Sequence, residues 1–151
     1  MANTSAICTS FKVELMQALH ALGTTVTRGG TGPDTIKAAL YLTSGSIGAG
    51  TTAYSATSEV SGTNYSAGGV TVTNGTAPNS GGTTAFWTPS AAIVYTTVTL
   101  STAFDTVLLY NSTQSNRAIL AFNFGSTTVT AGTLTLNMPA NAAGTALINL
   151  A

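Results

Sequence analysis

The feature that most constrains the fold is a series of short runs in which apolar residues alternate with threonine. The alternation is clearest over residues 94–100 and 134–138. Clusters of Gly, Asn, Ser and Pro separate the runs, as turns separate the strands of antiparallel sheets. Threonine suits such strands because its branched β-carbon favours extended backbone while its hydroxyl stays hydrated. The pattern predicts a mainly β chain.

We predict strands at residues 36–43, 53–57, 70–73, 85–88, 93–100, 106–110, 118–124, 127–130, 133–138 and 145–150. Their spacing favours an antiparallel β-sandwich, and it fits a jelly-roll-like or an immunoglobulin-like topology equally well. No repeat of fixed period is present, which argues against a β-solenoid.

The N-terminal region has a different pattern. Apolar residues recur there at spacings of four, four and three, which predicts one stripe of an amphipathic helix: Phe11, Leu15, Leu19 and Leu22. Thr9 or Ser10 could cap its start, and Gly23 could end it. Residues 24–33 are rich in glycine and threonine and predict a loop or arm. The chain therefore divides into a helix and arm over 1–33 and a β-sandwich domain over 34–151.

Charge is scarce in this sequence. Only 5% of its residues are charged, against about 25% in an ordinary protein, whereas 44% are hydrophobic. The four basic and four acidic residues balance, so the basic excess of a nucleic-acid-binding protein is missing. The longest apolar runs are too short for a membrane span, and no secretory signal is visible. The single cysteine, Cys8, is compatible with assembly in a reducing compartment.

The side chains capable of acid–base chemistry are few and scattered along the chain: His20, Glu14, Asp34, Glu59 and Asp105. No Gly-x-Ser-x-Gly nucleophile motif occurs. One Cys and one His are too few for a zinc site, and the carboxylates are too dispersed for a calcium loop. The glycines of residues 28–32 lack the Gly-Lys-Ser/Thr ending of a phosphate loop. We therefore expect no catalytic residue, metal or cofactor.

Scarce charge also bears on assembly. Free soluble proteins use charge to stay apart and to protect exposed strand edges, and this chain has little of it. Burial in a permanent assembly explains that composition and predicts a structural subunit. Our candidate subunit contacts are apolar helix residues and loop aromatics: Phe11, Leu15, Leu19, Tyr54, Tyr65 and Trp87. Trp87 fits either a core anchor or a partner contact, because tryptophan is enriched at interface centres.

Several segments resemble, in this order along the chain, a family of small virion-associated proteins of tailed bacteriophages. They are residues 34–42, 52–69, 107–111, 122–125 and 133–139. The most specific is Glu-Val-Ser-Gly-x-x-Tyr-x-Ala-Gly-Gly, which begins at Glu59 and ends at Gly69. In physical terms, its glycines allow tight turns, and we expect Glu59 to accept backbone amide hydrogen bonds there. The resemblance implies a structural place in the particle and supplies no functional residues.

These observations lead to one main hypothesis and two alternatives. The main hypothesis is a capsid decoration, or cement, protein that binds the outer lattice of the major capsid protein as a dimer or trimer. It would be located in the virion, be assembled in the host cytoplasm and bind neither nucleic acid nor membrane. One alternative is a tail or neck component, such as an adaptor, nozzle or fibre-base protein, which would contact portal or tail proteins. The other is a host-surface carbohydrate-binding module that stacks sugars on Trp87, Tyr54 and Tyr65.

Overall fold

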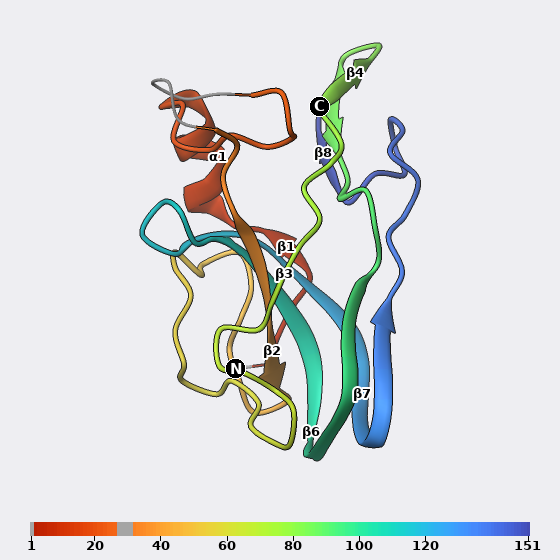
Figure 1. Ribbon diagram of the computed structural model, residues 1–151. Coiled ribbons are helices and arrows are strands. Elements are labelled where there is room, and N and C mark those ends of the chain that lie inside the picture. Colours follow the sequence, from red (N-terminus) through yellow and green to blue (C-terminus); the bar gives the residue numbers. More distant parts are fainter. Residues whose placement is uncertain (1, 27–31) are drawn as a thin grey trace.

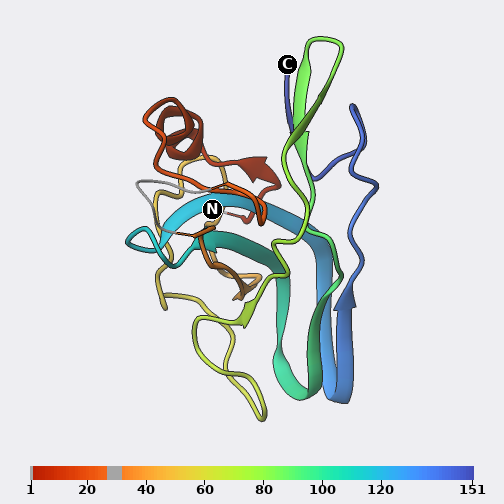
Figure 2. The same ribbon diagram turned by 45° about the horizontal axis from the view of Figure 1, so that its top comes forward.

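Two long strands organise the fold (Figure 1). The computed structural model describes residues 2–26 and 32–151. In it, β6 (Ile93–Asn111) and β7 (Arg117–Leu136) pair as an antiparallel hairpin. Both strands turn back on themselves at the end of the molecule opposite the helix (Figures 1 and 2). Thr97 and Ala131, with φ of 52° and 46°, lie near these bends. Each strand therefore contributes one leg to each of two layers.

The remaining strands extend the two long ones. The larger sheet has the order β1-β7-β6-β2-β3, in which β1 is Ala6–Ile7, β2 is Ile36–Leu42 and β3 is Val70–Thr71. A smaller sheet has the order β4-β5-β8, with β4 at Asn79–Gly81, β5 at Thr84–Trp87 and β8 at Ile148–Leu150. All these pairings are antiparallel. The predicted mainly β fold with one N-terminal helix is thus confirmed, with 43% of the residues in strands.

Individual strands differ from the prediction in three ways. The five strands predicted between residues 93 and 138 form two continuous strands. Both β6 and β7 continue through the small residues that we interpreted as breaks, and their pairing shifts register there. The strand predicted at 53–57 is wrong, since that segment forms only an isolated bridge between Ala53 and Arg117. The two short strands β1 and β4 were not predicted, because two or three residues carry no periodicity.

The helix α1 (Thr9–Met16) is shorter than predicted. It ends because Ala18 adopts a left-handed conformation, with φ of 56°. The amide of Ala18 then donates to the Leu15 carbonyl, and that of Leu19 to the Glu14 carbonyl. This is the Schellman arrangement, in which glycine is the usual residue. The start of α1 also differs from the prediction, because Cys8 rather than Thr9 or Ser10 occupies the N-cap, and its side chain makes no capping hydrogen bond. Alpha-helical spacing alone could not reveal this early end.

The core lies between the two layers and extends beneath α1. Cys8 and Phe11, from the N-terminal region, belong to the same buried cluster as β2, β6 and β7. Across the layers, the Tyr95 hydroxyl donates to the Ala38 carbonyl at 2.8 Å. Trp87 is 1% exposed, and its indole N–H donates to the Thr76 carbonyl at 2.9 Å. The described part of residues 1–33 thus packs against the β-domain, whereas the glycine-rich motif at 28–32 falls almost entirely outside the described residues.

Candidate functional site

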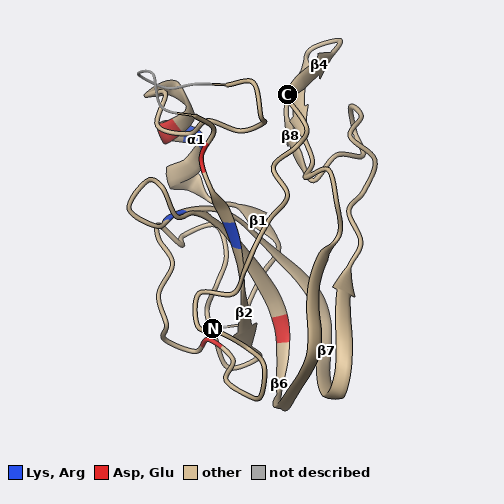
Figure 3. Cartoon of the chain, viewed as in Figure 1, with Lys and Arg blue, Asp and Glu red and all other residues tan. Residues whose placement is uncertain are grey.

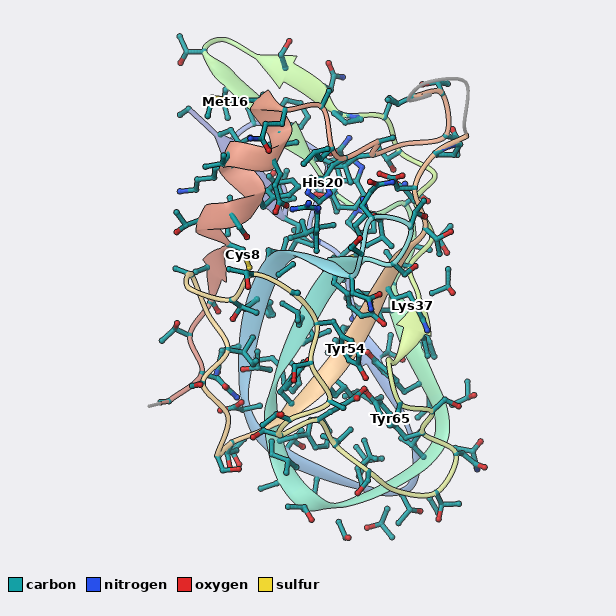
Figure 4. The ribbon with its side chains drawn as sticks, turned by 90° about the vertical axis from the view of Figure 1, so that its left-hand side faces the viewer. Cys8, Met16, His20, Lys37, Tyr54 and Tyr65 are labelled. Atoms are coloured by element: carbon teal, nitrogen blue, oxygen red, sulfur yellow. The ribbon has the colours of Figure 1, made fainter. Side chains whose placement is uncertain are left out.

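A buried polar network lies between α1 and the sheet. The Glu14 carboxylate contacts His20 Nε2 at 2.8 Å and the Arg117 guanidinium at 2.7 Å. The Asn111 side-chain amide contacts His20 Nδ1 at 3.0 Å and donates to Asp34 at 2.7 Å. Figure 4 shows His20 beside the helix, above the ends of the strands. The network ties the N-terminal region to the β6–β7 turn.

The hydrogen bonds of Asn111 fix the protonation state of His20. The side-chain oxygen of Asn111 accepts hydrogen bonds from the backbone amides of Thr113 and Gln114, each at 3.1 Å. The side-chain NH₂ group of Asn111 must therefore point toward His20 and Asp34. His20 Nδ1 therefore accepts, and Nε2–H donates to Glu14. A second proton on Nδ1 would face the NH₂ group of Asn111. His20 is thus held as a neutral ring with both nitrogens engaged, and its side chain is fully buried.

Acidification should therefore destabilise the fold. Burial lowers the pKa of His20 below 6.5, against the opposing effect of the Glu14 hydrogen bond. Below about pH 6.5 the unfolded chain binds a proton that the folded chain resists, so the free energy of unfolding falls as the pH falls. Denaturant unfolding between about pH 7.5 and about pH 5.5 should show this loss, and a smaller one in His20→Gln. Equal losses in the two proteins would contradict the assignment.

A second polar cluster surrounds Glu59, in the long loop between β2 and β3. Its carboxylate accepts from the hydroxyls of Tyr54 at 2.6 Å and Tyr65 at 2.7 Å, and from the amide of Gly68 at 2.7 Å. The predicted hydrogen bond from a backbone amide to the Glu59 carboxylate is confirmed. Figure 4 shows Tyr54 and Tyr65 under this loop, against the strands. Gly69 is required nearby, because a β-carbon there would meet the Ala38 carbonyl oxygen.

The tyrosines of this cluster are held neutral. Tyr54 stacks on Tyr110 with ring centroids 4.7 Å apart, and Tyr65 on Tyr95 at 5.9 Å. Burial, reinforced by Glu59, raises the pKa of Tyr54 to about 12. Burial also raises the pKa of Tyr65, although the amide of Leu40 opposes the shift. Both phenols keep their protons and donate them to the Glu59 carboxylate. These hydrogen bonds anchor the loop.

The other reactive candidates are also engaged within the chain. Asp105 accepts from the side chains of Asn3 at 2.6 Å and Thr106 at 2.9 Å. Cys8 is fully buried, and burial, followed by the charge of Glu14, raises the pKa of its thiol to about 12, so it is a poor nucleophile. Among the described residues, no group of three or more His, Cys, Asp or Glu side chains could hold a metal ion. No described helix is long and apolar enough to cross a membrane.

The predicted contact residues lie mostly inside the chain. Phe11 and Trp87 are buried in the core, and Leu15 packs partly buried against it. Leu19 is half-buried just beyond α1. The interpretation of Trp87 as a core residue is confirmed. A buried ring cannot stack on a sugar, so Trp87 does not fit the carbohydrate-binding alternative.

The surface instead offers an apolar groove that the sequence did not reveal. It has a volume of about 570 Å³ and lies between the legs of the bent strands. Val107, Leu109 and Phe122 line one side, Ile93 and Leu136 the other, and Leu147 borders it. No charged residue is among its lining residues. The bends bring residues 93 and 136 over residues 107–124, and only those bends, which strand periodicity does not encode, create the groove.

Fold and site together define a charge-poor, two-layered β protein with polar clusters engaged inside it and an apolar groove at its surface. No protein-family model, curated protein or solved structure matches the chain.

Proposed function

We propose that the chain is a structural, non-enzymatic subunit of a tailed-phage particle, and specifically a capsid decoration protein on the outer lattice of the major capsid protein. The supporting observation is that charged side chains are few and that the acidic ones are engaged within the chain. All four carboxylates accept hydrogen bonds from the chain's own side chains or backbone. Figure 3 shows long stretches of the sheets without a charged residue. A surface so poor in charge suits permanent contact with other subunits.

The polar clusters support a structural role for the same reason. His20, the chain's single histidine, uses both ring nitrogens to hold α1 and the β6–β7 turn together. Glu59 uses both carboxylate oxygens to hold the loop over the sheet. A general base must accept a substrate proton, whereas both ring nitrogens of His20 and both carboxylate oxygens of Glu59 already bond groups of the chain itself. The resemblance to small virion-associated proteins points to the same role.

Attachment to the particle should depend weakly on salt. Apolar burial and backbone pairing are screened little by ions, unlike charge-steered association. Purified chain would be added to particles that lack it, and the bound amount measured by sedimentation at about 50 mM and about 500 mM NaCl. We expect less than a twofold difference in bound chain. A loss of tenfold or more at the higher concentration would show that charge drives attachment.

A further inference from the structure

We propose that the apolar surface around Phe122 is a contact between two copies of the chain. The proposal rests on the proposed assembly role and names a self-contact within it. This "Phe122 surface" comprises the groove described above and an adjoining hollow of about 220 Å³, lined by residues that include Ala6, Ile7 and Leu120. Phe122 and Leu147 line both hollows, so the two are continuous around the Phe122 ring.

Phe122 is the large exposed apolar side chain of this surface. Its neighbours on β7, Leu120 and Ala121, are buried and pair with β1, whereas Phe122 is 44% exposed. Among the described strands, β1 covers only that part of the outer edge of β7. A large ring, a groove and an uncovered strand edge thus lie side by side. Contiguous exposed apolar surface of this kind marks an interaction site.

The lack of charge restricts what can cover this surface. The sequence contains no Lys, Arg, Asp or Glu from residue 118 to residue 151, which includes β7 beyond Arg117 and all of β8. A charged partner would lose hydration here and find no opposite charge in return, which opposes its binding. The covering surface must itself be uncharged. The same face of another copy meets that requirement without any like-charge repulsion.

Shape also favours a second copy. In a two-fold contact the same patch is used by both chains, so a projecting residue on one can enter a recess on the other, and the reverse. The exposed Phe122 ring lies at the groove, so the groove between Val107 and Leu136 of one chain could receive the ring of the other. One such contact would cover both rings and both grooves. A different apolar occupant, such as a fatty acid, would fill the groove of a single chain without joining it to a second one.

The test is the mass of the purified chain in solution, measured by light scattering and sedimentation over a range of concentrations. We expect twice the 15.1 kDa of one chain for the wild type. Phe122→Lys should raise the dimer dissociation constant by about tenfold or more, because two ammonium groups would be buried together. Val94→Lys and Met16→Lys are matched controls, since these residues are 39% and 82% exposed and lie outside the Phe122 surface. Both should remain dimers.

Phe122→Ala serves as a second variant if the lysine variant unfolds, and circular dichroism with thermal melting establishes that each variant folds. A folded Phe122→Ala that dissociates more readily than the wild type supports the proposal. A monomeric wild type at every concentration overturns it, and so does a dimer or trimer unaffected by changes at Phe122. A monomer that binds a fatty acid probe in the groove overturns it in favour of ligand binding. None of these results depends on whether the chain occurs in particles, so a failed self-contact and a failed decoration role remain distinguishable.

Discussion

Replacement of Glu59 by alanine should lower the free energy of unfolding by about 3 kcal/mol. The substitution removes the acceptor for two tyrosine hydroxyls and the Gly68 amide. Hydrogen bonds to a charged acceptor stabilise more than neutral ones, and the donors left behind lie partly buried. The loop that carries Tyr54 and Tyr65 would lose its anchor on the sheet. Chemical denaturation at neutral pH measures the effect directly.

The controls separate the carboxylate from its donors. Tyr54→Phe removes only one hydroxyl, and we expect a loss of about 1 kcal/mol. Thr57→Ala changes an exposed residue of the same loop and should alter stability by less than about 0.5 kcal/mol. If Glu59→Ala behaved like Thr57→Ala, the cluster would not anchor the loop, and Glu59 would be available for another role.

Replacement of Asn111 by alanine should also cost about 3 kcal/mol. Its side chain is fully buried and bonds Asp34, His20 and the backbone of the β6–β7 turn. Removal leaves several buried groups without this partner and opens a small cavity. It also removes the NH₂ group that opposes protonation of His20 Nδ1. The variant should therefore show a weaker dependence of stability on pH than the wild type below about pH 6.5.

Urea unfolding at two pH values measures both effects. Asn79→Ala is the matched control, because Asn79 is exposed in β4 and lies outside both the network and the Phe122 surface; it should change stability by less than about 0.5 kcal/mol. An Asn111→Ala protein as stable as this control, or one with the pH dependence of the wild type, would contradict the network described for His20.

Much of the fold could be predicted from the sequence because strand burial follows local pattern. The runs that are apolar on both faces, such as residues 38–42, form the buried β2 between two neighbouring strands. The residue pattern also placed Glu59 at a bend rich in backbone amides. These features depend on side-chain type and spacing over a few residues, which a single sequence displays.

The site was harder to predict because it depends on long-range geometry. Glu14 and Arg117 are 103 residues apart in the sequence. Asn111 is 91 residues from His20 and 77 residues from Asp34. The bends at Thr97 and Ala131 occur at residues with a side chain, where glycine would have been the usual signal for positive φ. Phe122 lies in the apolar run 118–124, a pattern typical of a core strand. Its exposure depends on the bends, so the sequence did not predict it.

The most direct test of the decoration role is the copy number of the chain in purified particles, relative to the major capsid protein, by quantitative mass spectrometry. The account predicts copies on the order of hundreds, as a lattice of icosahedral symmetry requires. A count near six or twelve would contradict decoration and move the chain to the tail or neck. Absence from the particle would contradict the structural role as a whole.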